Sequence, residues 1–314
     1  MRAILFPGQG SQYVGMGADF YKKFDLVKNF FSTVDETLGF SLSKIILNGS
    51  QEELQLTQNT QPAIMTVGVS IYNVLKNEYG FDLNKSSFFA GHSLGEYTAL
   101  VCAGSLSIEK AAYLLHERGK SMQDSVPSNQ GAMLAVLGMT VDEVENEINL
   151  FKEKGVCEIS NDNSNVQIVI SGEKKTIDKF NENLKRKKKK GILLSVSAPF
   201  HCSLMKKAAE KMKQKIQNTN FVKPEPSIIS NVTAQEEVDV NKIKPLLIDQ
   251  ITSRVRWRES VNYMIKKGVT NFLEIGPGKV LSGLVKKINR DVEISNINSI
   301  EDIKKWLISK IKIF

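Results

Sequence analysis

Cysteine and long apolar runs are scarce in this chain of 314 residues. Its three cysteines, Cys102, Cys157 and Cys202, show no metal-type spacing, and an odd, sparse count suits reduced thiols. No run approaches the roughly eighteen apolar residues that a membrane span requires. Pro7 and Gly8 come too early for the apolar region of a signal peptide. We therefore expect a cytoplasmic protein with no membrane association and no bound metal.

Acidic residues are outnumbered, 34 against 42 basic ones, which gives a formal net charge of +8. This excess favours acidic partners such as nucleic acid, CoA phosphates or an acidic protein. Much of it lies in residues 185–190, which form either a solvated helix end or a surface for an acidic partner. Aromatic residues do not interleave with this run, so we expect no nucleic acid as a partner.

Short apolar strands that stop at glycine turns are what the chain does have. Candidates are residues 2–6, 86–90 and 271–275, and the last is followed by a helical pattern over 280–288. Strand, glycine turn and helix in this order are typical of an α/β fold with a mostly parallel sheet. We expect an α/β-hydrolase-like large domain made of residues 1–126 and 197–314.

The middle of the chain follows a different order. Strands are expected at 133–138, 156–160, 166–171 and 192–197, and helices at 141–154 and 175–186. The order strand-helix-strand-strand-helix-strand is the ferredoxin-like pattern. We therefore predict that a ferredoxin-like small domain, residues 127–196, is inserted into the large domain.

A nucleophilic serine is indicated by residues 91–95, which read Gly-His-Ser-Leu-Gly and fit the elbow motif G-x-S-x-G. A strand candidate precedes the motif and a helical pattern follows it. Small neighbours permit a strained turn with Ser93 at its tip, and the turn aims the backbone N–H of Leu94 at whatever the serine attacks. An ordinary glycine-rich turn is the alternative, and the strand and helix around the motif favour the nucleophile.

A serine needs a base to attack at neutral pH, and the chain offers three histidines. His92 adjoins Ser93, and adjacent side chains on the elbow point apart. His116 lies inside a helical pattern, where a packed or surface role is the default. His201 lies at the start of a helix, whose positive end helps to keep imidazole neutral. A structural histidine on an apolar face is the alternative, and elimination favours His201 as the base.

Arg118 lies on the apolar face of the helical pattern 107–123, three residues after Leu115 and four before Met122. A guanidinium that faces the core needs an anionic partner. That partner is either a protein carboxylate in a structural ion pair or a substrate carboxylate held by two parallel hydrogen bonds. The residues alone leave both interpretations open.

Six separate segments together resemble the signatures of one family. These segments are Phe6 to Gln12, Leu56 to Pro62, Gly91 to Glu96, His116 to Arg118, Pro199 to His201 and Glu274 to Gly278. In sequence and in order they are similar to the malonyl-CoA:acyl-carrier-protein transacylases of fatty-acid synthesis. The resemblance spans nearly the whole chain, and six motifs are far more specific than one elbow.

This resemblance implies a function and a set of roles. It implies malonyl-CoA as the substrate, acyl carrier protein as the partner and no cofactor. Ser93 is then the nucleophile and His201 the base, while the backbone N–H groups of Gln12 and Leu94 form the oxyanion hole. Arg118 is then the clamp on the malonyl carboxylate.

Further residues enter through the same resemblance. The backbone carbonyl of Gln250 is implied to orient the catalytic histidine, so no aspartate is expected in that role. Gln61 is implied near the pocket, and the bulk of Phe200 is expected to disfavour an α-methyl group, a discrimination worth about 1–3 kcal/mol. One departure is Arg254, where many relatives have proline, and we expect it to loosen the loop after Gln250.

Two other functions stand as alternatives. A serine esterase or thioesterase shares the elbow, but its histidine normally lies late in the chain, whereas a long segment without histidine follows His201. A basic protein that binds RNA or membranes would account for residues 185–190 but leaves the six segments unexplained. We therefore expect a monomeric acyltransferase.

Overall fold

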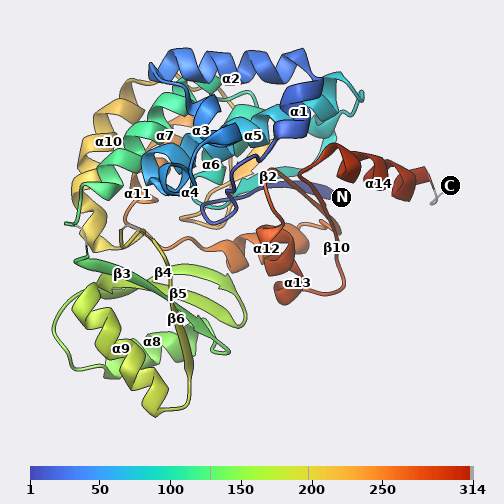
Figure 1. Cartoon of the computed structure of the whole chain (residues 1–314). Helices are drawn as coiled ribbons and strands as arrows, with labels where there is room; N and C mark the ends of the chain where they lie inside the picture. Colours follow the sequence, from blue (N-terminus) through green and yellow to red (C-terminus); the bar gives the residue numbers. More distant parts are fainter. Residues whose placement is uncertain (128, 197, 312–314) are drawn as a thin grey trace.

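The computed structural model describes residues 1–127, 129–196 and 198–311 of the chain, which form two β-sheets with their helices (Figure 1). The larger sheet has the strand order β10-β9-β1-β2-β7-β8, and all neighbours are parallel except β7 and β8. Its strands are β1 (Arg2–Phe6), β2 (Phe88–Gly91), β7 (Ser227–Ile229), β8 (Glu236–Glu237), β9 (Asn271–Ile275) and β10 (Glu293–Ile297).

Helices cover the larger sheet on both faces. The helices of this part of the chain are α1 (Ala18–Lys23), α2 (Asp25–Leu38), α3 (Leu42–Asn48), α4 (Gln51–Gln55), α5 (Thr57–Asn77), α6 (Gly95–Cys102), α7 (Ile108–Gln123), α10 (Lys206–Asn218), α11 (Val240–Asp249), α12 (Trp257–Lys266), α13 (Val280–Ile288) and α14 (Ile300–Ile311), with short 3₁₀ turns η1 (Leu83–Lys85) and η2 (Ser203–Met205).

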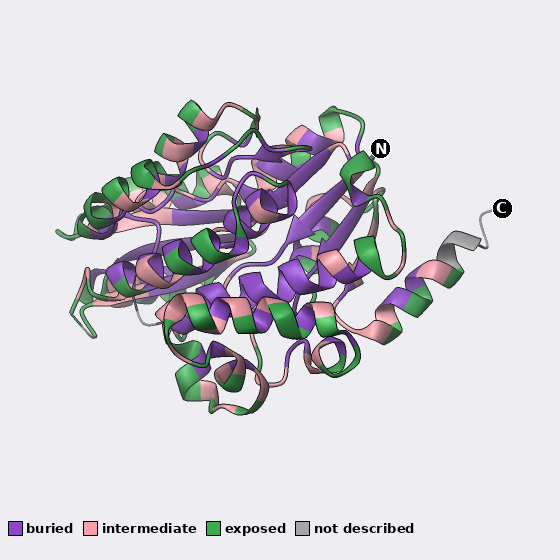
Figure 2. Cartoon of the chain, turned by 90° about the horizontal axis from the view of Figure 1, so that it is seen from above, coloured by how far each residue is buried: buried purple, intermediate pink, exposed green. Residues whose placement is uncertain are grey.

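Strand β1 shows why both faces are covered. Ile4 and Phe6 belong to the apolar cluster shared with α2, α5, α6 and α7, while Ala3 and Leu5 point the other way, into the cluster shared with α12 and α13. Successive side chains of a strand face opposite sides, so a strand that is apolar throughout needs helices on both. The central strands β1, β2 and β9 are accordingly almost wholly buried, and Figure 2 shows buried strands between helices that carry exposed residues.

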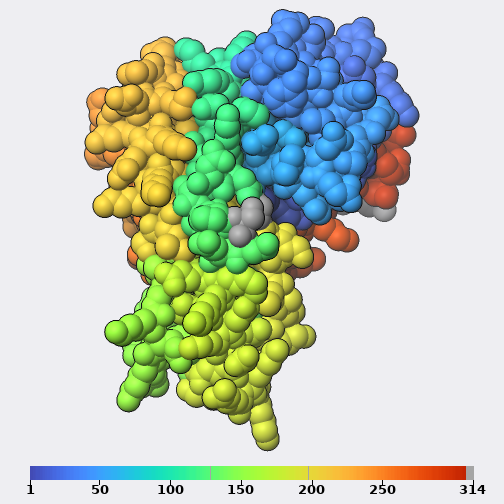
Figure 3. Space-filling view, turned by 60° about the vertical axis from the view of Figure 1, so that its left-hand side comes forward, coloured from blue at the N-terminus to red at the C-terminus, as the bar shows by residue number. Residues whose placement is uncertain are grey.

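The smaller sheet is antiparallel, with the order β4-β5-β3-β6. Its elements are β3 (Gly131–Leu137), α8 (Val141–Leu150), β4 (Cys157–Ser164), β5 (Gln167–Glu173), α9 (Lys174–Arg186) and β6 (Lys190–Leu193). Apolar residues of β3 and β5 pack with α8 and α9 in a core of their own. In the chain this unit lies between α7 and η2, and Figure 3 shows it as a lobe below the rest.

The expected elements compare closely with the observed ones. Strands at 2–6 and 271–275 and the helix at 280–288 have the predicted bounds, and the predicted order of strands and helices in the middle of the chain is confirmed. Strands β7, β8 and β10 were not predicted. The strand expected at 192–197 is instead β6 at Lys190–Leu193, and residue 197, the expected domain boundary, lies outside the described residues. No helix in the described part of the chain is long and apolar enough to cross a membrane.

Gly95 lies where α6 packs closely against β1, and Gly283 is a helical glycine without such a contact. A Cβ on Gly95 would lie 2.3 Å from the carbonyl oxygen of Phe6, whereas a Cβ on Gly283, within α13, would meet nothing within 4 Å. We expect Gly95→Ala to lower the free energy of unfolding by about 1–3 kcal/mol or more. We expect Gly283→Ala to raise it by about 0.5–1 kcal/mol, because alanine favours helix. Urea unfolding of both variants measures this, and equal shifts would contradict the close contact.

Candidate active site

The elbow at residues 91–95 is the sharp turn between β2 and α6. Ser93 has a φ of 55°, in the left-handed region that most residues avoid. The side chain of Asn231 holds this turn, because its Oδ1 accepts a hydrogen bond from the backbone N–H of Ser93 at 2.7 Å and its Nδ2 donates to the carbonyl of Gly91 at 2.7 Å. The backbone strain at Ser93 is therefore balanced by contacts from a distant loop.

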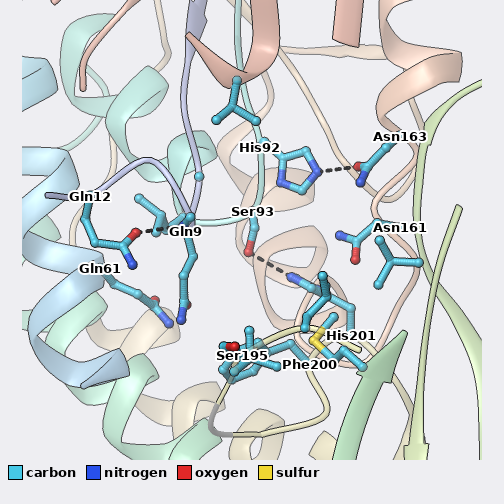
Figure 4. A pocket seen from close by; sticks show the side chains of 18 of the residues that line it. Gln9, Gln12, Gln61, His92, Ser93, Asn161, Asn163, Ser195, Phe200 and His201 are labelled. Carbon is cyan, nitrogen blue, oxygen red and sulfur yellow. Dashed lines mark hydrogen bonds between the residues drawn. The ribbon is translucent and has the colours of Figure 1, made fainter. Parts of the chain in front are cut away.

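His201 faces the tip of the elbow (Figure 4). Its Nε2 lies 2.8 Å from Ser93 Oγ, and its Nδ1 lies 2.7 Å from the backbone carbonyl of Gln250. A carbonyl only accepts, so Nδ1 carries the proton and Nε2 is left to accept from the serine hydroxyl. Burial lowers the pKa of His201 to about 3, and the positive charge of Arg118 adds to this effect. The imidazole is therefore neutral at pH 7, as an acceptor must be.

Arg118 is buried on the other side of the serine hydroxyl. Its Nη2 donates to Ser93 Oγ at 3.1 Å and to Gln250 Oε1 at 2.8 Å, and its Nη1 donates to Gln61 Oε1 at 2.7 Å. Its Nε has no hydrogen-bond partner among the described residues. A guanidinium has five N–H groups, so this one keeps unused donors inside the protein. All of its hydrogen-bond partners among the described residues are neutral, which leaves the cation without a direct ion pair there.

Glu96, in the first turn of α6, is the buried carboxyl group of this network. One of its oxygens accepts from Gln250 Nε2 at 2.7 Å and from the backbone N–H of Asn231 at 3.1 Å. Burial raises the pKa of Glu96 to about 7, although both hydrogen bonds and Arg118 act in the opposite direction. The amide of Gln250 therefore lies between a buried guanidinium and a buried carboxyl group.

A cavity of about 650 Å³ opens above the serine, between the two sheets. The larger sheet and its helices contribute Ser93, Arg118 and His201, and the smaller sheet contributes residues such as Asn161 and Val169. This volume lies in the range that is usual for small-molecule sites. Figure 4 shows Ser93, His201, Gln61 and Phe200 around this space.

Among the backbone amides at the cavity, two that could serve an oxyanion have no partner within the described part of the chain. They belong to Gln12 and Leu94, both of which line the cavity. The side chain of Gln12 turns back, and its Oε1 accepts from the N–H of Gly10 at 2.7 Å. The N–H of Ser93 is already bound to Asn231, so it is not a third donor.

The cysteines do not compete as nucleophiles. Burial raises the pKa of Cys157 and of Cys202 to about 12, and it raises the pKa of Cys102 well above its ordinary value. A thiol attacks as its thiolate, so all three are inert at neutral pH. Among the described residues, no three histidine, cysteine or carboxylate side chains come together as metal ligands.

Comparison with known sequences identifies the family of this chain. A family model described as an acyl transferase domain matches residues 4–306. The chain belongs to this acyl transferase family. Within the family it is similar to the malonyl CoA-acyl carrier protein transacylase of Bacillus subtilis, with 44% identity over 96% of this chain and 95% of the relative. The corresponding protein of Haemophilus influenzae is 40% identical over 95% of each chain.

Solved structures of acyltransferases share the whole fold. The acyl-carrier-protein-S-malonyltransferase of Bartonella henselae superimposes with a TM-score of 0.94, at 41% identity and over 98% of both chains. A malonyl-transacylase solved in complex with its type II polyketide acyl-carrier protein also has a TM-score of 0.94, at 36% identity, covering 98% of this chain and 99% of that one.

The residues expected from the sequence converge in this acyltransferase. Seven line the cavity, namely Gln12, Gln61, Ser93, Leu94, Arg118, Phe200 and His201. Gln250 lies behind His201 and contacts it through its backbone carbonyl. Of the other histidines, His92 bonds Asn163 Oδ1 at 2.9 Å and His116 bonds the carbonyl of Gln58 at 3.0 Å, so neither approaches the serine hydroxyl.

Sequence reasoning missed two residues of the site. Glu96 stands inside a recognised segment, but its burial and its bond to Gln250 have no signature in the sequence. Asn231 accepts a hydrogen bond from the backbone N–H of Ser93, which lies 138 residues away in the chain. The loop that contains Asn231 carries no motif. Only the fold brings these groups together.

The low pKa of His201 predicts how stability depends on pH. The unfolded histidine binds a proton near pH 6.5 and the folded one only near pH 3, so the unfolded state gains protons first as the pH falls. Below pH 6.5 wild type should therefore lose about 1 kcal/mol of unfolding free energy per pH unit more than His201→Gln. The raised pKa of Glu96 changes the unfolding free energy in the opposite direction as the pH falls. Wild type and His201→Gln both contain Glu96, so the difference between them reports on His201. Urea unfolding at pH 7, 6 and 5 measures the difference, and parallel curves would show that His201 titrates normally.

Proposed function

We propose that this acyltransferase moves the malonyl group of malonyl-CoA to the phosphopantetheine thiol of acyl carrier protein through a malonyl ester on Ser93. The observation that carries the proposal is the placement of Ser93 Oγ, which lies 2.8 Å from His201 Nε2 and 3.1 Å from Arg118 Nη2. A base and a cation at one hydroxyl provide for both the attack and the charged end of a malonyl group. The names of the similar proteins agree with this activity.

The transfer has two similar halves. Ser93 Oγ attacks the thioester carbonyl while His201 Nε2 takes the serine proton, which then passes to the departing CoA thiol. In the second half the carrier's thiol gives its proton to His201 and attacks the serine ester, which restores the hydroxyl. The N–H groups of Gln12 and Leu94 stabilise the oxyanion, and the carbonyl of Gln250 keeps the histidine in the required tautomer.

Arg118 binds the free carboxylate of the malonyl group. A carboxylate that enters this cavity loses its water, which costs several kcal/mol unless a cation pairs with it. Two parallel N–H groups are needed for a bidentate pair, so the carboxylate takes over contacts that the guanidinium now makes with Ser93 Oγ or Gln250. Gln61 holds the other end of the guanidinium, and Phe200 lines the pocket where an α-methyl group would lie.

The reaction requires no cofactor, because the chain supplies the nucleophile, the base and the oxyanion donors, and malonyl-CoA is a substrate. A monomer as the active unit remains an expectation from the sequence. The acyl carrier protein is the partner, in line with the names of the relatives and the solved complex of a similar enzyme. A cytoplasmic location and the absence of nucleic-acid or membrane partners remain expectations from the sequence.

The finer description of the fold is also a proposal. Residues 127–196 form a ferredoxin-like domain, which the strand order β4-β5-β3-β6 and the two helices between its strands support. Residues 1–126 and 197–314 form an α/β-hydrolase-like domain, which the parallel sheet and the elbow at the end of β2 support. Residue 197 itself lies outside the described part of the chain.

The basic run 185–190 remains a prediction as a surface that steers the carrier. It forms the end of α9 and the turn into β6, at the tip of the lower lobe and away from the helices of the larger sheet (Figure 1). Lys187 pairs with Glu147 at 2.6 Å, which neutralises part of the run. Steering from this distance would be long-range and sensitive to salt.

The first test of the function is the mass of the protein after brief exposure to malonyl-CoA. Wild type should gain one malonyl group, localised to Ser93 by peptide mapping, because the ester is an intermediate of the transfer. Ser93→Ala should gain none, and His201→Ala should gain it more slowly by a factor of at least about 100. An adduct in Ser93→Ala at the wild-type rate would falsify the assignment of the nucleophile.

The second test concerns the substrate role of Arg118. We expect Arg118→Ala to lose malonyl transfer far more than acetyl transfer, because acetyl has no carboxylate to pair. Arg118→Lys should recover only part of the malonyl activity, since an ammonium lacks the planar fork. The measurement is kcat/KM for malonyl-CoA and acetyl-CoA in wild type and both variants. If both substrates lose activity by the same factor in Arg118→Ala, the residue is structural.

A further inference from the structure

Strand β4 of the smaller sheet contacts all three segments that carry or orient the reacting groups. These segments are the elbow with Ser93, the loop of His201 and the loop that follows Gln250. β4 is the edge strand of its sheet, so one side of it is available to other parts of the chain. The proposed mechanism uses β4 only as a wall of the cavity, through Asn161 and Asn163.

The first contact holds the loop after Gln250. The N–H of Asp162 donates to the carbonyl of Val255 at 2.9 Å and the N–H of Val255 donates to the carbonyl of Ser160 at 2.8 Å, which makes a parallel bridge. The fully buried carboxylate of Asp162 accepts from Nε and Nη2 of Arg258 at 2.8–3.1 Å. A bidentate pair of this kind fixes orientation as well as distance.

The second contact holds the histidine loop. The carboxylate of Glu158 accepts from the N–H of Ser203 at 2.8 Å and from its hydroxyl at 2.6 Å. Ser203 begins η2, two residues after His201, whose own φ is 58°. A non-glycine residue in the left-handed region persists only where its surroundings hold it, at a cost of order 1–3 kcal/mol.

The third contact reaches the elbow itself. Asn163 Oδ1 lies 2.9 Å from Nε2 of His92, the residue before the nucleophile (Figure 4). The side chains of Glu158 and Asn163 thus meet the base loop and the nucleophile's turn, while Asp162 meets the loop after Gln250 through its backbone and Arg258 of α12 through its carboxylate. A single rigid strand that contacts all three segments fixes their mutual distances.

We propose that β4 holds His201 in hydrogen-bonding position toward Ser93, with Asp162 and Glu158 as positioning residues of the acyl transfer. The inference rests on the proposed roles of Ser93 and His201. Asp162 acts through the segment that follows Gln250, and the backbone carbonyl of Gln250 accepts a hydrogen bond from Nδ1 of the imidazole. Glu158 acts through the turn that follows His201.

Arg254 belongs to the same arrangement. From the sequence we expected this residue, in place of a proline, to loosen the loop after Gln250. In the structure its Nη1 donates to Glu145 of α8 at 2.7 Å, which adds a link between this loop and the smaller sheet's helices. Because Glu145 is half exposed, the link contributes less than the buried pair of Asp162.

The test uses phenylmethanesulfonyl fluoride, which has neither a thiol arm nor a carboxylate and therefore makes none of the contacts that recognise the substrate. Ser93 Oγ forms a bond to its sulfur, fluoride leaves, and the hydroxyl proton goes to His201, so the inactivation rate reports on the Ser93–His201 pair alone. We expect Asp162→Asn to slow inactivation by roughly tenfold or more, and Glu158→Gln by a smaller factor, because misplaced reacting groups lose rate steeply. The acylation rate with saturating malonyl-CoA should fall by the same factors.

The matched control is Glu153→Gln, which removes one negative charge and an ion pair with Lys179 of 2.6 Å on the same lobe, away from these loops. It should inactivate at the wild-type rate. Thermal unfolding shows that each variant is folded at the assay temperature, and if Asp162→Asn is not, Glu158→Gln alone decides. Inactivation of both variants within about twofold of wild type overturns the proposal. A rise in KM for malonyl-CoA in these variants with an unchanged inactivation rate also overturns the proposal, because β4 then only binds substrate.

His201→Ala separates this inference from the proposed function. It should resist the sulfonyl fluoride. If it reacts as fast as wild type, His201 is not the base and the proposed function fails. If it resists while the β4 variants react normally, the proposed function stands and the positioning role of β4 is wrong.

Discussion

A guanidinium buried beside the reactive hydroxyl is the constraint on which the site depends. Arg118 is 1% exposed and bonds only neutral groups, so the protein must stabilise its charge by other means. It does so with amide oxygens from Gln61 and Gln250, and with the carboxyl group of Glu96 one amide further away. The same charge lowers the pKa of His201 and so helps to keep the base neutral. Substrate charge, nucleophile and base are in this way coupled through one side chain.

Gln250 links the two halves of that arrangement. Its side chain lies between Arg118 and Glu96, while its backbone carbonyl accepts from His201. An aspartate in place of this carbonyl would put a second negative charge beside the guanidinium and compete with a substrate carboxylate for it. A neutral carbonyl orients the imidazole without that competition, which suits an enzyme whose substrate brings its own negative charge.

Much of the fold and the reacting pair could be predicted from the sequence. The apolar strand at residues 271–275, its glycine turn and the following helix have local signatures, and so does the elbow. His201 emerged because few histidines exist, and the roles of Gln12 and Gln250 came only from the resemblance to a family. Short edge strands such as β8, with two residues, have no apolar period to detect.

What the sequence did not predict is the set of polar groups that hold backbone in place. Asn231, Glu96 and Asp162 act on residues 96 to 154 positions away, and any soluble protein has many residues of these types in loops and strand ends. Their function follows from burial and from contacts between distant segments. Such contacts are a property of the tertiary structure and leave no spacing pattern in one chain.

The position of β1 in the larger sheet has a consequence for biosynthesis. This strand is made long before β9, yet it pairs with β2 on one side and with β9 on the other, so that Ile4 is the partner of Leu273. A growing chain on the ribosome therefore carries an apolar strand with one open edge until β9 has emerged, and it depends on protection against aggregation throughout that time. Since the elbow packs on the end of β1, the reactive serine becomes correctly placed only after β9 has been synthesised as well.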